Sequence, residues 1–197
     1  SSIEVFGIDT MPERCAECQE KYGMKKNSVK LIPLIETAMG VENAYRIASA
    51  DERVAAIFLG AEDLSADLRC KRTKEGTEIL YSRQRLVVAA RAAGVDVYDT
   101  PFTDVNDDEG IRKDASFAKA LGFTGKASIS PRHIDAINEA FSPTQADIKY
   151  AHEVMNAIEQ AALEGKGVVA LRGKMIDAPV VARAKQVIEM EKAIYGA

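Results

Sequence analysis

Short apolar runs that alternate with longer helical stretches are the feature that most constrains how this chain can fold. The predicted strands are rich in aliphatic residues and span residues 30–35, 54–59, 95–98 and 126–129. The predicted helices between them span residues 41–48, 77–93 and 107–121, with a polar loop over 61–76. Glycines at 94 and 122 are typical of helix ends. This order is typical of βα units, and therefore predicts a parallel sheet.

The C-terminal third has a different, mostly helical pattern. Helices are predicted at residues 131–140, 143–164 and 178–194, with a short strand at 168–171. Residues 1–29 are expected to form a polar helical piece and a loop. The sequence thus predicts one α/β domain over 1–197, with βα units at 30–140 and a helical extension at 141–197. A (β/α)₈ barrel typically needs about 250 residues, and a doubly wound sheet would also fit this length, so the pattern alone leaves both architectures open.

Composition excludes several classes of protein. The chain has 197 residues, of which 26 are basic and 30 acidic, for a net charge of −4. An acidic balance without basic clusters argues against nucleic-acid binding. The longest apolar run, residues 54–61, is far shorter than the roughly 20 residues of a membrane-spanning helix. No secretory signal is visible, and three cysteines do not make a disulfide framework, so a cytoplasmic location is expected.

Two carboxylates stand where predicted strands have just ended. Glu36 follows the first strand and Asp63 follows the second, 27 residues later. Because sites in parallel α/β folds gather at the carboxyl ends of the strands, both side chains are expected to face one pocket. Two protein oxygen donors, with the other positions left to water and substrate, suit Mg²⁺. The alternative is that both residues are acids that stabilise helix N-termini.

Five segments in the same order resemble one family of enzymes. They are residues 34–40 (LIETAMG), 58–67 (FLGAEDLSAD), 98–106 (YDTPFTDVN), 125–132 (GKASISPR) and 173–179 (GKMIDAP). Together they are similar to the citrate lyase beta subunits, within the HpcH/HpaI aldolase superfamily of malyl-, citramalyl- and citryl-thioester lyases. The resemblance covers roughly residues 28–195. It implies a TIM-type (β/α)₈ barrel that here lacks its N-terminal βα units and a substrate-binding arginine, with a C-terminal helical extension.

The resemblance also implies roles for individual residues. Glu36 and Asp63 would bind the divalent metal, Mg²⁺. The backbone of Gly60, Ala61 and Glu62 would lie beside it and hold a substrate carboxylate.

Asp177 would take part in acid/base catalysis in the site of a neighbouring subunit. An N-cap role is equally compatible with this aspartate, because Ala178 and Pro179 follow it as a normal helix start.

The implied activity is Mg²⁺-dependent cleavage of a carbon–carbon bond in a citryl thioester, giving oxaloacetate and an acetyl thioester. The partners implied are an acyl-carrier-protein or CoA thioester, other citrate lyase subunits, and further copies of the chain in a trimer or hexamer. Lys71, Arg72 and Lys74 could meet carrier phosphates, or simply form a solvated surface. The alternatives are a malyl- or citramalyl-CoA lyase, a thioesterase of the same superfamily, or a non-catalytic fragment or subunit.

Overall fold

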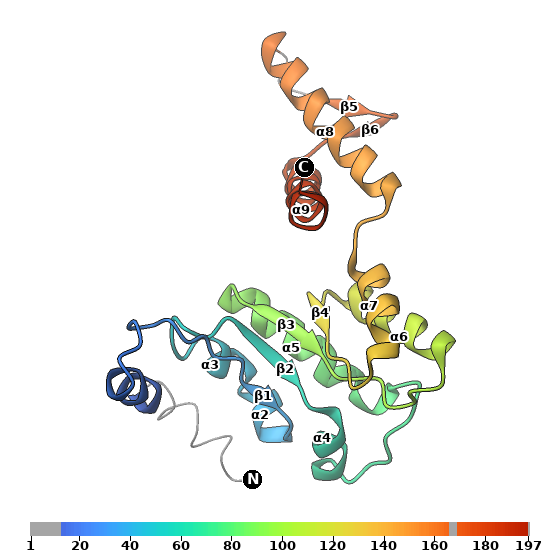
Figure 1. The fold of residues 1–197 in the computed structure, drawn as a ribbon. Helices are drawn as coiled ribbons and strands as arrows, with labels where there is room; N and C mark the ends of the chain where they lie inside the picture. The colour runs from blue at the N-terminus through green and yellow to red at the C-terminus, as the bar shows by residue number, and fades with distance from the viewer. Residues whose placement is uncertain (1–12, 166–168, 197) are drawn as a thin grey trace. The chain divides into compact units, whose positions relative to one another are not determined.

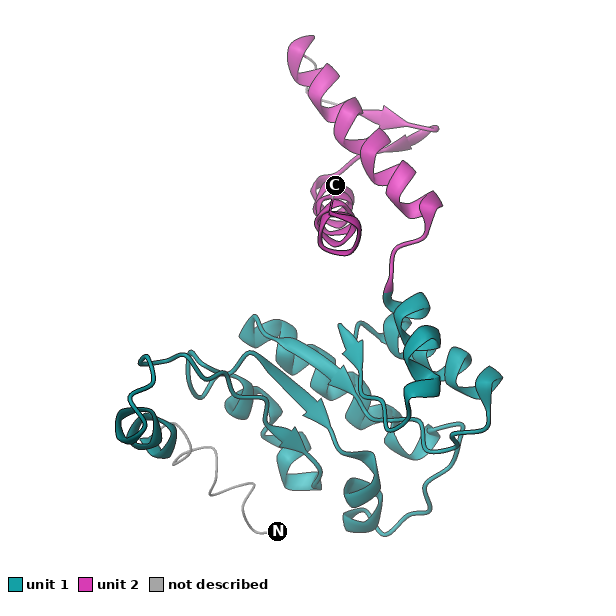
Figure 2. Ribbon diagram, in the orientation of Figure 1, with its two compact units in different colours: residues 1–141 teal, residues 142–197 magenta. Residues whose placement is uncertain are grey.

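A computed structural model describes residues 13–165 and 169–196. The chain divides into two compact units, residues 1–141 and residues 142–197 (Figure 2). Residues 13–21 are helical, in agreement with the polar helical piece expected near the N-terminus, while residues 1–12 lie outside the described part.

The first unit is built on a parallel four-stranded sheet (Figure 1). Its strands are β1 (Leu34–Ile35), β2 (Ala56–Leu59), β3 (Asp96–Asp99) and β4 (Gly125–Lys126), and they are neighbours in that order. The prediction of a parallel α/β sheet is thereby confirmed. The first strand is shorter than predicted: Leu31 still pairs with Val54 as an isolated bridge, but Pro33, which has no N–H to donate, interrupts the ladder.

Helices connect the four strands and follow the last one. They are α2 (Ala38–Glu42), α3 (Ala44–Ala48), α4 (Ala61–Asp67), α5 (Leu80–Ala93), α6 (Asp108–Leu121) and α7 (Ile134–Phe141), with 3₁₀ turns η1 (Thr77–Ile79) and η2 (Pro131–His133). α5 and α6 end at Gly94 and Gly122, whose φ values of 74° and 107° are left-handed. The predicted ends of both helices are therefore confirmed.

The prediction of a polar loop over 61–76 is wrong for its first part, where α4 forms. Ala61 and Leu64 are buried, at 1% and 0% exposure, so this short helix is stabilised by packing against the core. Its N-cap, Gly60, offers no side chain to the helix amides. The helix thus forms through packing against residues distant in sequence, without a local capping signal. The polar residues of this stretch therefore gave a misleading prediction of a loop.

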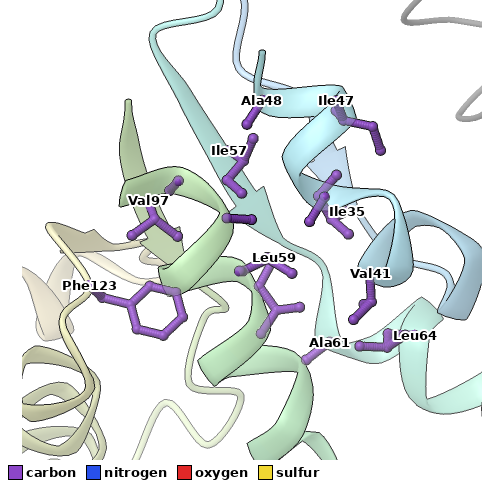
Figure 3. Packing of buried hydrophobic residues seen from close by; sticks show 14 of the residues in the cluster. Ile35, Val41, Ile47, Ala48, Ile57, Leu59, Ala61, Leu64, Val97 and Phe123 are labelled. Carbon is purple, nitrogen blue, oxygen red and sulfur yellow. The ribbon is translucent and has the colours of Figure 1, made fainter. Parts of the chain in front are cut away.

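The core lies between the sheet and the helices on one of its faces (Figure 3). Ile57 and Leu59 of β2 and Val97 of β3 pack there with Ile47 of α3 and Leu86 of α5. Strand side chains alternate between faces, so their neighbours point the other way.

On that second face, one row of paired residues crosses all four strands. It consists of Leu34, Phe58, Tyr98 and Gly125.

The second unit contains two long helices and a hairpin. Its elements are α8 (Gln145–Leu163), β5 (Ala170–Leu171), β6 (Lys174–Met175) and α9 (Ala178–Tyr195). Thr144 and Asp147 form a capping box at the start of α8. Val154, Ile176 and Ala184 form the centre of its core. The predicted strand at 168–171 is present from Ala170, and residue 168 lies outside the described residues.

Within the described ranges, no helix combines the length and apolar character required to cross a bilayer.

Candidate functional site

The ends of β1 and β2 bring Glu36 against Gly60. Ile35 and Leu59 are paired in the ladder, and the Gly60 amide donates to the Ile35 carbonyl at 2.9 Å. A β-carbon on Gly60 would lie 2.8 Å from Glu36 Cβ and 3.1 Å from Glu36 Oε2. Glycine is needed at position 60 because the Glu36 side chain occupies the space that a β-carbon would take.

Glu36 does not cap the helix that follows it. The N-cap of α2 is Thr37, whose Oγ1 accepts from the Gly40 amide at 3.0 Å. The half-buried Glu36 precedes the cap, so Thr37 and not Glu36 caps α2. For Asp63 the helix-stabilising alternative fits the structure, because Asp63 lies in the first turn of α4.

Helix α4 carries Asp63 in its first turn, with the residue exposed. One turn later, Asp67 Oδ2 accepts from the Ala38 amide at 2.7 Å. Residues four apart lie on the same helix face, so the face of α4 that bears Asp63 is directed toward the segment just after Glu36. Among residues 13–165 and 169–196, no cluster of three or more histidine, cysteine, aspartate or glutamate side chains is arranged as a metal site. A site built on Glu36 and Asp63 would thus have two protein carboxylates.

The backbone at 60–62 is largely engaged within the protein. The Gly60 amide donates to Ile35, and the Ala61 amide donates to Thr100 Oγ1 at 3.3 Å. Glu62 is the second residue of α4, a position whose amide has no acceptor inside a helix. The amides of Gly60 and Ala61 are thus bonded within the chain, and the binding of a substrate carboxylate by the backbone of Gly60, Ala61 and Glu62 stays a prediction.

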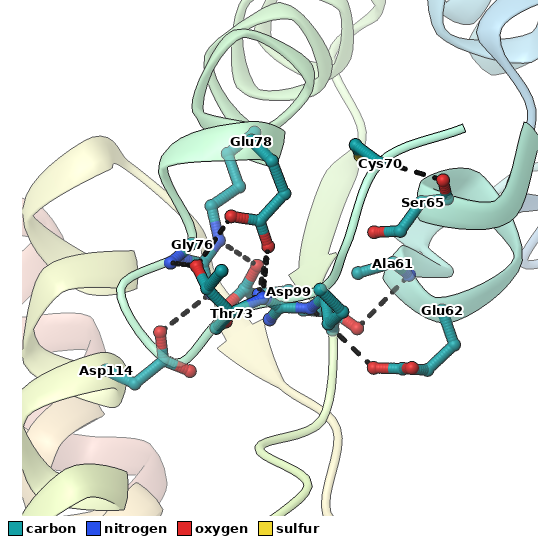
Figure 4. Close-up of polar contacts among 12 residues, drawn as sticks. Ala61, Glu62, Ser65, Cys70, Thr73, Gly76, Glu78, Asp99 and Asp114 are labelled. Atoms are coloured by element: carbon teal, nitrogen blue, oxygen red, sulfur yellow. Dashed lines mark hydrogen bonds and ion pairs between the residues drawn. The ribbon is translucent and has the colours of Figure 1, made fainter. Parts of the chain in front are cut away.

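A buried group of four charges lies at the carboxyl ends of β3 and β4. Figure 4 labels its two carboxylates, Asp99 and Asp114. Arg83 of α5 binds Asp99 through two hydrogen bonds of 2.9 and 2.8 Å. Lys126 Nζ lies 2.7 Å from Asp99 Oδ2 and 2.5 Å from Asp114 Oδ2 of α6. Arg83 Nη2 also donates to Asp114 Oδ1 at 2.8 Å. We refer to these four residues as the buried charge cluster; its two positive and two negative charges balance.

Neighbouring opposite charges shift the pKa values of Asp114 and Arg83 in the buried charge cluster. Burial alone would raise the pKa of Asp114, but Lys126 and Arg83 outweigh that effect and hold the pKa of this carboxyl below its usual value. Burial likewise opposes the charge of Arg83, yet Asp99 and Asp114 raise its pKa. Asp114 and Arg83 therefore stay charged at neutral pH.

The sequence contains a signal for this cluster. Arg83 falls on the same face of α5 as Ile79 and Leu86, which are fully buried. A charged residue within an apolar stripe must be paired when it is buried. Asp99 also directly follows a predicted strand, as Glu36 does.

Of the three basic residues Lys71, Arg72 and Lys74, the last two form ion pairs within the chain. Arg72 Nη1 lies 2.8 Å from Glu78 Oε1, and Lys74 Nζ lies 2.6 Å from Asp104 Oδ2 and 2.8 Å from Asp107 Oδ2. Hydrogen bonds to Asp104 and Asp107 raise the pKa of Lys74. A carrier phosphate would have to compete with these carboxylates.

Asp177 is the N-cap of α9. Its Oδ1 accepts from the Val180 amide at 3.1 Å, and Pro179 stands in the first turn. The capping role is thus observed, and it leaves the second carboxylate oxygen available for other chemistry. Asp177 belongs to the second unit, whereas Glu36 and Asp63 belong to the first.

The chain is similar to several characterised proteins. It is 41% identical over 183 residues to citrate lyase subunit beta of Haemophilus influenzae, covering 93% of this chain and 63% of that protein. A structure of protein CitE from Mycobacterium tuberculosis with magnesium, acetoacetate and coenzyme A matches with a TM-score of 0.68 and 31% identity, covering 82% of this chain and 60% of that one.

A Mycobacterium tuberculosis citrate lyase beta subunit with oxaloacetate and magnesium matches with a TM-score of 0.54 and 33% identity. That match covers 58% of this chain and 53% of the other. The chain therefore spans a little over half to nearly two thirds of the proteins that it matches.

The family comparison agrees with these relatives. The sequence profile described as HpcH/HpaI aldolase/citrate lyase matches residues 7–131, which contain the whole four-stranded sheet and both strand-end carboxylates. This chain belongs to the HpcH/HpaI aldolase/citrate lyase family.

Proposed function

We propose that the chain forms the metal-binding part of a Mg²⁺-dependent carbon–carbon lyase that cleaves a citryl thioester to oxaloacetate and an acetyl thioester. The observation that carries this proposal is the close packing of Gly60 on Glu36, which brings together the two strand ends that bear the carboxylates. Related structures contain magnesium with oxaloacetate or acetoacetate. Because the chain spans only part of its relatives' length, the complete activity is proposed for a protein of the family's full length that contains this chain.

We propose further that the four-stranded sheet is part of a (β/α)₈ barrel. Phe58, Tyr98 and Gly125, which belong to the row on the second face, line a hollow of about 260 Å³ together with Lys126 and Ala127. A barrel interior is filled by inward-pointing side chains of this kind.

Glu36 and Asp63 have the chemistry that Mg²⁺ requires. Both are carboxylates, and they follow neighbouring strands whose ends are in contact. Bound Mg²⁺ would chelate the substrate's hydroxyl and adjacent carboxylate and act as a Lewis acid on the hydroxyl. The Glu62 amide, at the start of α4, would donate to a substrate carboxylate oxygen.

Asp177 is the proposed proton-transfer group. Cleavage needs a base to remove the proton from the substrate hydroxyl and an acid to protonate the carbon released as the acetyl carbanion equivalent. We assign one of these transfers to Asp177 of a neighbouring protomer. The active protein is then a homo-oligomer, because the site needs residues from two copies of the chain. Its cap bond to Val180 holds the carboxylate in a defined position.

Turnover and metal binding test the proposal together. Citryl thioester should be cleaved only with Mg²⁺, and titration calorimetry with Mg²⁺ alone should detect binding that Glu36→Gln and Asp63→Asn each abolish. Absence of Mg²⁺ binding in the unmodified chain would refute the site. Mg²⁺ binding without turnover, measured on a protein of the family's full length, would favour the non-catalytic alternative.

A second substrate class deserves a parallel assay. One related structure contains coenzyme A, which favours a CoA thioester as the carrier. Malyl- and citramalyl-CoA should therefore be assayed beside citryl thioesters on acyl carrier protein and on CoA. The ratio of kcat/KM values decides between a citryl lyase and the malyl- or citramalyl-CoA alternative, and release of free CoA without carbon–carbon cleavage would indicate a thioesterase.

A further inference from the structure

Thr100 connects the end of β3 to the helix that carries Asp63. It follows β3 directly, is only 2% exposed, and accepts a hydrogen bond from the Ala61 amide through Oγ1 at 3.3 Å. Figure 4 shows Ala61 and Asp99 within this group of polar contacts. The bond joins residues 39 positions apart, so it connects the end of β3 to the start of α4 within the first unit.

Helix α4 has little capacity to fix its own start. It has seven residues, and Gly60 caps it without a side chain. A helix this short is not stable by itself in water. The orientation of α4 therefore depends on contacts with its neighbours. Glu36 packs against Gly60. The Ala38 amide donates a hydrogen bond to Asp67, and the Ala61 amide donates one to Thr100.

Thr100 is itself held from the opposite side. Lys126 Nζ donates to the Thr100 carbonyl at 2.6 Å, and the Lys126 side chain is fully buried in the charge cluster. The carbonyl and hydroxyl of one residue thus link the buried charge cluster to α4. No part of this link uses Glu36 or Asp63.

From this arrangement we infer that Thr100 is a positioning residue for the proposed metal site. It holds the first turn of α4, which carries Asp63, in place beside the end of β3, and so acts on the site through the position of Asp63. The inference rests on the proposed function only in that Asp63 is the ligand being positioned. The contacts that support it are independent of any bound group.

Three variants separate positioning from general stability. Thr100→Val keeps the shape but removes the acceptor, and Thr100→Ser restores an oxygen. Thr124→Val is the matched control. Thr124 Oγ1 accepts a hydrogen bond from the Val97 amide of β3 at 3.0 Å, just before β4 begins. This bond lies at the amino ends of the two strands, away from Asp63. The measurements are Mg²⁺ affinity by titration calorimetry, amide hydrogen exchange at Ala61, and urea unfolding, all on the full chain.

Thr100→Val should weaken Mg²⁺ binding about 10-fold to 100-fold, the range known for residues that orient metal ligands. It should also speed exchange of the Ala61 amide, and Thr100→Ser should restore most of both. Thr124→Val should lose similar stability with unchanged Mg²⁺ affinity. If Thr100→Val does not fold because the valine side chain is not accommodated, Thr100→Ala removes the same hydroxyl acceptor with a smaller side chain.

Unchanged Mg²⁺ affinity in Thr100→Val, with Asp63→Asn still abolishing binding, would overturn the inference while leaving the proposed function intact. An equal loss of affinity in Thr124→Val would also overturn it, because the effect would then be one of stability alone. If the unmodified chain binds no Mg²⁺, the inference fails together with the proposed function.

Discussion

Arg83 and Asp99 form a two-bond ion pair in which neither side chain is exposed to solvent. Removing one partner of such a pair leaves a buried charge without compensation, which typically costs about 3–5 kcal/mol. We expect Arg83→Met to lower the free energy of unfolding by an amount of this order, measured by urea denaturation. Arg91→Met is the control, since Arg91 is exposed on the same helix. Equal stability of the two variants would contradict the role assigned to the buried charge cluster.

The packing of Gly60 on Glu36 predicts that Gly60→Ala is harmful for a reason other than backbone strain. The φ of Gly60 is −97°, which alanine adopts readily. The added β-carbon would instead meet Glu36 Cβ at 2.8 Å, so Glu36 must move. Overpacking of this kind costs about 1–3 kcal/mol, and Mg²⁺ affinity should fall as well.

A double variant isolates the contact. Glu36→Gly removes the opposing β-carbon, so Gly60→Ala should cost less stability in that background than in the unmodified chain. Additive effects on the free energy of unfolding would show that the two positions do not press on each other.

The lowered pKa of Glu78 makes the free energy of unfolding depend on pH in the acid range. Burial alone would raise its pKa, but the amide and hydroxyl of Thr73 and the guanidinium of Arg72 lower the pKa from 4.5 to about 2. Because the folded-state pKa is depressed, the stabilisation is complete above pH 4.5 and is lost as the pH falls toward about 2.

Glu78→Gln should therefore make the dependence of unfolding free energy on pH shallower in that window. Urea denaturation at several pH values measures the slope. Glu75→Gln, at an exposed position of the same loop, is the control and should leave the slope unchanged. Parallel pH profiles for Glu78→Gln and the unmodified chain would refute the prediction.

Local signals made part of this structure predictable. Asp107 and Gly122 mark the two ends of α6, and both act within a few residues of the helix they delimit. The sheet order followed from the βα repetition, because consecutive parallel strands joined by helices pair in sequence. Glu36 and Asp63 were identifiable for the same reason, since both follow a strand.

What could not be predicted depends on residues distant in sequence. α4 is held by Thr100, 39 positions from Ala61, and by the Ala38 amide, 29 positions from Asp67. No window of residues 61–76 contains either partner. The buried charge cluster likewise draws on two helices and two strands. The apolar stripe around Arg83 marks this residue as buried, but no local pattern identifies its partners.

Asp177 provides the test that separates capping from catalysis. Asparagine keeps an oxygen that can accept from the Val180 amide, whereas alanine does not. Asp177→Asn should thus leave stability and Mg²⁺ affinity nearly unchanged but lower turnover about 100-fold or more, as expected when a general acid or base is lost. Asp177→Ala should also lose about 0.5–2 kcal/mol of stability. Full turnover of Asp177→Asn, when chemistry limits the rate, would make this residue a cap only.

Mixing inactive protomers tests whether the site is shared between copies. In a hybrid of Asp177→Asn with Glu36→Ala, one protomer retains Glu36 and its neighbour retains Asp177. If Asp177 acts in a neighbour's site, the mixture regains part of the activity that neither variant has alone. If both groups act within one chain, every site in the mixture lacks one of them and no activity returns. Glu36→Ala mixed with Asp63→Asn is the control, because both mutations affect the same carboxylate pair and hybrids should stay inactive under either arrangement.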